Sequence, residues 1–135
     1  MSDWNAGIIT EFRENAGNVG GVFDGKPLLL LNHLGAKTGL ERVSPLMYQS
    51  VDGGYAVFAS KAGAHTHPDW MYNLQANPEV TVEVGTATVP VTAREATSEE
   101  REPIWVKQKA DYPQFAEYEA STERVIPVFI LEPRS

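Results

Sequence analysis

The sequence predicts a mainly β protein with helices (α+β), in which about six mostly antiparallel strands form a small barrel or a strongly coiled sheet. Two hairpin signals follow one another between residues 27 and 60, which indicates an antiparallel meander. Helical patterns stand at the breaks between groups of strands, and a last apolar segment must return to the sheet. The same elements could also form an open sheet. The length of 135 residues suits one domain, which we place at 1–135.

The first expected element is an amphipathic N-terminal helix. It follows Ser2 and Asp3, which can cap it, and Gly17 ends the pattern. Apolar side chains recur along it at helical spacing, at Trp4, Ile8, Ile9, Phe12 and Ala16. We expect this face to pack on the sheet, and contact with a lipid surface or an apolar substrate is the alternative.

Three strands should follow. The run 27–34 is apolar and bounded by proline and glycine, and its length favours a strand buried on both faces. Residues 43–51 are expected to form the returning strand, and residues 55–60 a third strand after a turn at 52–54. Pro68 and Asn77-Pro78 then frame a helix at 68–78.

The last part of the chain alternates between strands and helices. Apolar and polar residues alternate at 79–85 and 87–95, which indicates a hairpin. A capping box starts a helix at Thr97, and Pro103 should kink this helix or shift its start. A second short helix is expected at 111–120 and a final strand at 125–131. Two prolines should place their strands at a sheet edge or a bulge, namely Pro90 and Pro127.

Charge is distributed unevenly along the chain. The net charge of -7 argues against a nucleic-acid surface. Residues 25–50, however, hold three cations and one carboxylate, a local charge of +2, whereas residues 79–123 hold four cations and ten carboxylates, a charge of −6. The sequence therefore predicts that a small anion binds within 25–50.

Several classes of protein are disfavoured by the composition. The chain has no cysteine, so disulfides and thiolate metal sites are excluded, which suits a reducing cytoplasm. No apolar run approaches the roughly 20 residues of a membrane span, and the first 18 residues carry charges that a signal peptide would lack. We expect a soluble, cytoplasmic protein, with peripheral membrane contact through the N-terminal helix left open. His65 and His67 have no third ligand at a suitable spacing, so no metal site is predicted.

Residues 35–45, which we call the cradle, have the composition of an anion-binding segment. Its glycines, Gly35 and Gly39, allow positive φ and a close approach, so that backbone N–H groups can face phosphate or carboxylate oxygens. Lys37 and Arg42 would add charge and, for the arginine, a bidentate fork. A hairpin turn with solvated cations is an equally open alternative. The spacing excludes a P-loop.

Three motifs, in this order and spacing, resemble the deazaflavin (F420)-dependent nitroreductase family. They are Gly35-x-Lys37-Thr38-Gly39-x-x-Arg42-x-x-Pro45-Leu46, Ala59-Ser60-Lys61-x-Gly63 and Pro68-x-Trp70-x-x-Asn73-Leu74-x-Ala76-Asn77-Pro78. The resemblance runs from about Trp4 to Pro133. It implies a split β-barrel of the flavin-reductase-like kind, coenzyme F420 as the bound anion, and hydride transfer to quinones, enones or nitroaromatics.

The resemblance also implies which residues hold F420. The phosphate and the polyglutamate tail would lie on Gly35, Lys37, Thr38, Gly39, Arg42 and Ser44. The deazaflavin would be lined by Pro45 and bordered by Ala59, Ser60, Lys61, Gly63 and Asn73. F420 carries a phosphodiester and several carboxylates, so the local charge of +2 suits it.

Ser60, Tyr112 and Tyr118 are the candidate catalytic residues, as hydrogen-bond or proton donors to the acceptor. The two tyrosines match positions where the nitroreductase of the family has tyrosines at its substrate pocket. Phe115 and Met47 depart from that nitroreductase, and each departure removes a hydroxyl. A loop cap at position 60 and plain helix packing of the rings are equally open alternatives.

The sequence thus leaves three hypotheses for function. The first is an F420H2-dependent oxidoreductase that reduces a small apolar acceptor. The second is a protein of the same fold that binds F420 without turnover, and the third exchanges F420 for FMN or haem. The resemblance further implies a homodimer, while the physiological acceptor and the length of the polyglutamate tail stay open.

Overall fold

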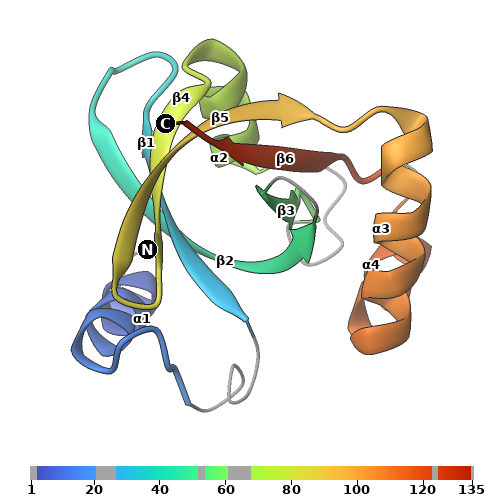
Figure 1. The fold of residues 1–135 in the computed structure, drawn as a ribbon, viewed down its shortest axis with the longest axis horizontal. Helices are drawn as coiled ribbons and strands as arrows, with labels where there is room; N and C mark the ends of the chain where they lie inside the picture. The colour runs from blue at the N-terminus through green and yellow to red at the C-terminus, as the bar shows by residue number, and fades with distance from the viewer. Residues whose placement is uncertain (1–2, 21–26, 52–53, 61–67, 123–124, 135) are drawn as a thin grey trace.

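The computed structural model shows six strands closed into a barrel, with every neighbouring pair antiparallel (Figure 1). The structure describes residues 3–20, 27–51, 54–60, 68–122 and 125–134. The strands in these residues are β1 (Leu28–Leu34), β2 (Glu41–Val51), β3 (Gly54–Phe58), β4 (Glu79–Val84), β5 (Ala87–Glu95) and β6 (Val128–Pro133). The helices are α1 (Asp3–Glu14), α2 (Asp69–Ala76), α3 (Ser98–Asp111) and α4 (Gln114–Ala120). The predicted α+β fold class and the barrel are confirmed.

The strand order around the barrel is β1-β2-β3-β6-β5-β4. Its interior is filled by apolar side chains from all six strands, and α2 lies over one end (Figure 1). The helix inserts three side chains into this core, Trp70, Met71 and Leu74. α2 also lies next to the loop that joins β1 and β2, because Asn73 of α2 accepts a hydrogen bond from the Ala36 N–H of that loop.

β1 is buried on both faces, as its apolar run predicted. Leu29 and Leu31 face the barrel interior, whereas Leu28 and Leu30 pack outside against Ile8 and Phe12 of α1. These contacts between α1 and β1 confirm that α1 packs on the sheet. The side chain of Trp4 lies outside what the structure describes.

α3 and α4 cover the outer face of β3 and β6 (Figure 1). The predicted capping box is confirmed, since Thr97 Oγ1 accepts from the Glu100 N–H while the Glu100 carboxylate accepts from the Thr97 N–H. Pro103 does not shift the start, because α3 begins at Ser98 and continues through position 103. The second helix begins later than predicted, at Gln114, so Tyr112 is the C-cap of α3.

Neither strand that carried a predicted edge proline is an edge strand, since β5 and β6 each have two neighbours in the barrel. β5 pairs with β4 over 87–92 and with β6 over 91–95, so Pro90 lies opposite Thr81 of β4 just before the pairing with β6 begins, which agrees with a local edge at this position. The Pro90 carbonyl accepts from the Arg134 N–H, so the missing amide faces the point where β6 ends and costs no ladder bond. Pro127 precedes β6, and its carbonyl accepts from the Ala59 N–H.

Candidate functional site

Residues 35–40 join β1 to β2 in a tight loop, which we call the cradle loop. The Gly35 N–H donates to the Leu40 carbonyl and the Gly39 N–H to the Gly35 carbonyl, both at 2.9 Å. Gly39 has φ +70°, as its predicted role requires, but Gly35 does not have positive φ. A Cβ at Gly35 would instead lie 2.5 Å from Thr38 Oγ1. Glycine at position 35 therefore leaves room for the Thr38 hydroxyl and does not supply an unusual backbone angle.

Only part of the cradle loop's backbone is available to a ligand. The amides of Gly35 and Gly39 bond within the loop, and that of Leu40 donates to Thr38 Oγ1 at 3.2 Å. The Ala36 N–H donates to Asn73 Oδ1 of α2 at 2.8 Å. Within the described part of the chain, two amides of the loop have no hydrogen-bond partner, those of Lys37 and Thr38.

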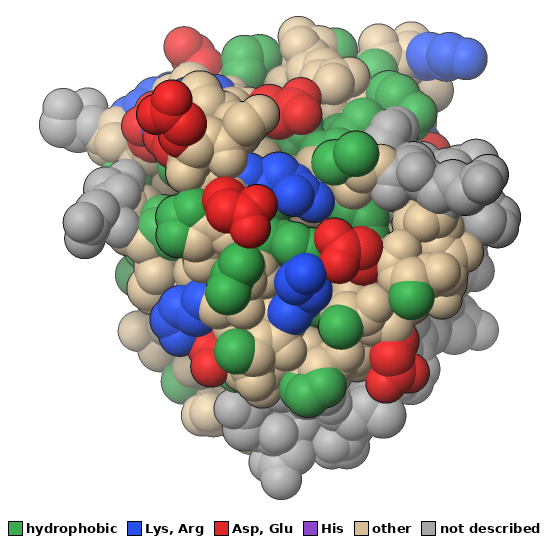
Figure 2. Space-filling view, turned by 90° about the vertical axis from the view of Figure 1, so that its right-hand side faces the viewer, with side chains coloured by type: hydrophobic (Ala, Val, Ile, Leu, Met, Phe, Trp, Pro, Cys, Tyr) green, Lys and Arg blue, Asp and Glu red, His purple; other side chains and the backbone are tan. Residues whose placement is uncertain are grey.

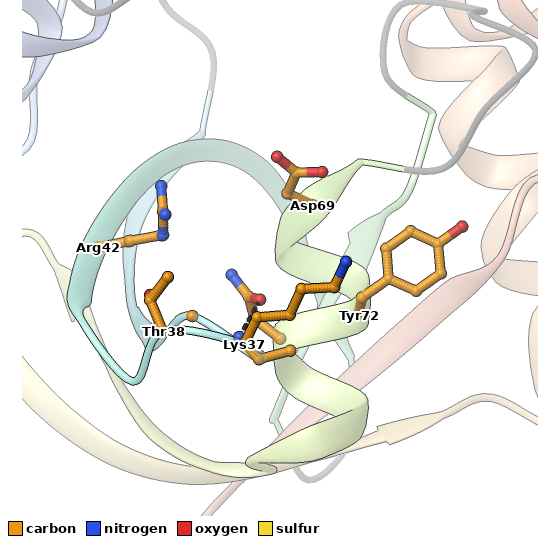
Figure 3. Close-up of a pocket in the computed structure, with 8 residues that line it drawn as sticks. Lys37, Thr38, Arg42, Asp69 and Tyr72 are labelled. Carbon is orange, nitrogen blue, oxygen red and sulfur yellow. Dashed lines mark hydrogen bonds between the residues drawn. The ribbon is translucent and has the colours of Figure 1, made fainter.

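An open pocket of about 530 Å³ lies between the cradle and α2 (Figure 3). Lys37 reaches across the front of α2 toward Tyr72, while Arg42 rises from β2. We call this the cradle pocket, and its lining residues are Gly35, Ala36, Lys37, Thr38, Arg42, Asp69, Tyr72 and Asn73.

Positive charge dominates the cradle pocket. Lys37 and Arg42 have neither an ion pair nor a side-chain hydrogen bond to the residues that the structure describes. A single carboxylate lines the pocket, that of Asp69 in the first turn of α2. The pocket can therefore offer two free cations and two free amides to an anionic ligand.

Two lining residues were not predicted. Asp69 and Tyr72 lie three residues apart on α2 and share its outer face, opposite the core residues of that helix. The Tyr72 side chain is 47% exposed. Their helical spacing against the buried face of α2 could have revealed them from the sequence.

The cradle pocket brings together five of the predicted cofactor-binding residues, Gly35, Lys37, Thr38, Arg42 and Asn73. Gly39 lies in the same loop. Ser44 and Pro45 are adjacent on β2 and therefore point to opposite faces of the strand. The Ser44 hydroxyl is bonded to His33 Nε2.

Two further predicted cofactor residues, Ala59 and Ser60, directly follow β3. Ala59 is fully buried in the barrel core, and Ser60 is 8% exposed. Neither lines the cradle pocket as far as the described residues define it. Lys61 and Gly63 lie outside the described residues, and so do His65 and His67. No group of three potential metal ligands occurs among the residues that the structure describes.

The candidate catalytic tyrosines lie in another part of the molecule, between α3 and α4. Tyr112 and Tyr118 pack against a cluster formed by Phe58, Trp105 and Phe115, which we call the aromatic cluster. The rings of Phe115 and Tyr118 meet edge to face with 5.2 Å between centroids. Both tyrosines are half-buried, and neither lines the cradle pocket in the described structure.

One buried residue of the site gave no sequence signal. His33 is 4% exposed and contacts two predicted site residues, with Nε2 at 2.9 Å from Ser44 Oγ and Nδ1 at 2.9 Å from Asn73 Nδ2. Burial, together with the positive charge of Arg42, lowers the pKa of His33 to about 4. Its ring is therefore neutral at neutral pH.

The sequence and the fold are similar to those of known proteins. The profile of a family described as F420H(2)-dependent quinone reductase matches residues 7–133. A Mycobacterium tuberculosis protein, Rv3178, to which that activity is provisionally assigned, is 39% identical over 108 residues, 80% of this chain and 91% of that protein. A solved F420-H2 dependent reductase, FDR-A, has a TM-score of 0.71 and 47% identity, over 78% of this chain and 94% of that chain. A second solved structure, described only as a domain-swapped dimer, has a TM-score of 0.73 and 43% identity, over 97% of this chain and 98% of that chain.

Proposed function

The chain belongs to the F420H(2)-dependent quinone reductase family, and from this premise we propose that it transfers a hydride from reduced F420 to a small apolar acceptor such as a quinone, an enone or a nitroaromatic. Its cofactor is coenzyme F420, and it is an F420-dependent reductase. This decides against the hypotheses of an FMN or haem protein and of a protein without turnover. The identity of the acceptor and the roles of the residues are the proposal.

The chemistry of the cradle pocket fits the anionic part of F420. That part carries a phosphodiester and carboxylates, each of which needs cations or N–H donors once it leaves water. Lys37 and Arg42 are the cations, and the amides of Lys37 and Thr38 are the donors. The single observation that supports this assignment most is that both cations lack a partner within the described chain.

The other predicted cofactor residues keep their proposed places. Pro45 and Ser60, with Lys61 and Gly63, would border the deazaflavin ring, on the strength of the motifs that carry the resemblance. Ala59, which is fully buried in the barrel core, would act indirectly by supporting the residues that follow it. Asn73 would contribute indirectly, because its side chain is 5% exposed and holds the cradle loop. Ser44 would also act indirectly, through its bond to His33.

Reduced F420 supplies a hydride when it is bound. A quinone that receives a hydride also needs a proton, or a hydrogen bond, on its carbonyl oxygen. We assign this role to the hydroxyls of Tyr112, Tyr118 and Ser60. The aromatic cluster beside the two tyrosines is apolar, which suits an apolar acceptor better than a charged one.

The test is a reduction assay with purified protein and chemically reduced F420. Menadione, an enone and a nitroaromatic are offered in turn, and the absorbance of oxidised F420 is followed. We expect oxidation of F420 that depends on the acceptor and is fastest with the quinone. Phe115 and Met47 stand where the nitroreductase of the family has hydroxyl groups, so the acceptor site proposed here is more apolar and suits a nitro group less well. Oxidation no faster than in the absence of protein for all three acceptors would contradict the proposal.

We further propose that the protein works in the cytoplasm as a homodimer. Support for the dimer comes from the similar structure described as a domain-swapped dimer. No helix in the described residues is long and apolar enough to cross a membrane. Ile8 and Phe12 of α1 are buried against β1, which removes them from any lipid contact. Light scattering behind a sizing column tests the dimer, and a monomer at micromolar concentration would contradict it.

A further inference from the structure

A line of hydrogen bonds, buried at its centre and partly buried at its two ends, connects β2 to the cradle loop through His33. Ser44 Oγ of β2 lies 2.9 Å from His33 Nε2 of β1, and His33 Nδ1 lies 2.9 Å from Asn73 Nδ2 of α2. Asn73 Oδ1 in turn accepts from the Ala36 N–H at 2.8 Å. We call these four residues the His33 relay. It ties the two strands on either side of the cradle loop to α2, which is about 40 residues away in sequence, and α2 to the loop that carries Lys37.

The relay has a single consistent set of donors and acceptors. The Ala36 N–H can only donate, so Asn73 must present its oxygen to the loop and its NH2 group to His33. His33 Nδ1 must then accept, which leaves the one ring proton of a neutral imidazole on Nε2. That proton is donated to Ser44 Oγ. Each group thus fixes the orientation of the next.

We propose that His33 is a positioning residue for F420 binding, because its neutral ring, protonated on Nε2, orients Asn73, and Asn73 fixes the Ala36 amide and with it the cradle loop. This inference rests on the proposed function, in which the cradle pocket holds the anionic part of F420. Ala36 directly precedes the two residues whose amides are available to a ligand, Lys37 and Thr38. A fixed Ala36 amide restricts the backbone of Lys37 and Thr38 before F420 binds, so less conformational entropy is lost on binding.

Burial makes the relay selective for one protonation state. His33 and Asn73 are 4% and 5% exposed, so water cannot replace a lost partner cheaply. A proton on His33 Nδ1 would face the Asn73 NH2 group, and turning the amide over would set that group against the Ala36 N–H. Protonation must therefore break the relay at one link or the other.

The charges around His33 come from several elements. Arg42 lies opposite it on β2 and disfavours the imidazolium. Glu41, Glu79 and Arg134 line, with His33, a groove of about 250 Å³ at this end of the barrel, and Asp69 of α2 lines the cradle pocket on the other side. In the described structure the two ring nitrogens bond only to Ser44 and Asn73, so no carboxylate holds a proton on the ring.

The test compares His33→Leu, His33→Gln and Ser44→Ala with a control, Gln49→Leu. Gln49 donates to Gln108 and to the Ile104 carbonyl, so its loss breaks a polar contact of α3 away from the cradle. The first readout is the exchange rate of the Ala36 amide in protein without cofactor. The second is the dissociation constant of F420, and the third is turnover at saturating F420.

We expect His33→Leu to speed exchange of the Ala36 amide and to raise the dissociation constant of F420 about tenfold, because a buried hydrogen bond is lost and the cradle loop is no longer held. Turnover at saturating F420 should be unchanged. His33→Gln and Ser44→Ala should have smaller effects in the same direction, and they keep the test open if His33→Leu fails to fold. NMR should show the neutral ring protonated on Nε2. Unchanged exchange and affinity in all three variants, or effects equal to those of Gln49→Leu, would overturn the proposal. If the wild type bound no F420, the proposed function would fail, whereas the exchange of Ala36 would still decide whether the relay exists.

Discussion

The cradle and the region of α3 and α4 use their charges in opposite ways. In the cradle, Lys37 and Arg42 have no partner within the described chain. Around α3 and α4 the cations are engaged, for example Lys109 with Glu119 at 3.0 Å and Arg94 with Glu100 at 2.7 Å. Figure 2, which views the molecule from the side of α3 and α4 in Figure 1, shows basic and acidic side chains interspersed on that face.

This difference indicates that the unpaired cations of the cradle can bind a ligand, whereas the paired cations around α3 and α4 serve the fold. Exposed ion pairs contribute little to stability, and their charges are already compensated, so an incoming anion gains little from them. Cations without a partner keep their full attraction for a ligand. The number of lysines and arginines in a region is therefore a weaker guide to a binding site than the number that are unpaired.

The largest expected effect follows from removing a free cation. Lys37→Ala or Arg42→Ala should raise the dissociation constant of F420 by roughly ten- to a hundredfold, because each loses a charge-assisted hydrogen bond of about 1.5–3 kcal/mol. Fluorescence titration of F420 measures this, and added salt should weaken wild-type binding as well. Lys107→Ala removes a paired cation and serves as the matched control, with affinity unchanged. Equal affinity in wild type and both cradle variants would move the anion site elsewhere.

The tyrosines near α3 and α4 should have the opposite effect to the cradle cations, because replacing them should lower turnover and leave the affinity for F420 unchanged. Tyr112→Phe or Tyr118→Phe keeps the ring in the aromatic cluster and removes only the hydroxyl. Turnover with menadione should fall by up to about a hundredfold if the residue is a general acid, while F420 binding holds. Tyr55→Phe, whose ring meets Tyr48 in the barrel, is the control. Loss of F420 affinity with normal turnover at saturation would reverse the assignment.

A smaller effect is expected at the one carboxylate of the cradle pocket. Asp69→Asn removes a negative charge that opposes an anionic ligand. Because Asp69 is exposed, the gain should be about 0.2–1 kcal/mol, so F420 should bind up to about fivefold more tightly. Isothermal titration at low salt is the measurement. Weaker binding by Asp69→Asn would mean that the carboxylate contacts the ligand favourably through a donor or a cation.

The smallest effect concerns stability and pH at a paired charge. Its hydrogen bonds to Arg94 and to the Thr97 N–H lower the pKa of Glu100 to about 2. In the folded protein the carboxylate stays charged until the pH approaches about 2. Its contribution to stability is therefore fully present above the pKa of the unfolded state and is lost as the pH falls to about 2. Wild type should have a slightly higher Tm than Glu100→Gln at pH 7, and this difference should vanish near pH 2. A difference that grew on acidification would contradict this sign.

The sequence predicted best what depends on neighbours in the chain. The apolar run of β1, the hairpin around Gly85 and the capping box at Thr97 are local signals, and each element forms where it was expected. Barrel closure brings β1 to β4 and β3 to β6 across long separations, so no local pattern could reveal that Pro90 lies in a strand paired on both sides.

The cradle shows the same limit at the level of the site. Its two cations were predicted from composition, but the available amides were not, because internal bonds of the loop and the Asn73 side chain decide which N–H groups remain. His33 was missed because a single histidine inside an apolar run has no periodicity to distinguish it. Its role depends on Asn73, which lies 40 residues away.

Barrel closure also affects how copies of this protein can meet. An open sheet exposes a row of unpaired backbone groups that can template the growth of a larger sheet and, with it, aggregation. Each of the six strands here is paired on both sides over at least part of its length, so the barrel offers few unpaired backbone groups to which a strand of another copy could add. A second copy would have to be recognised through side chains or through the exchange of a whole segment, and that protects the fold while the cradle stays exposed to its ligand.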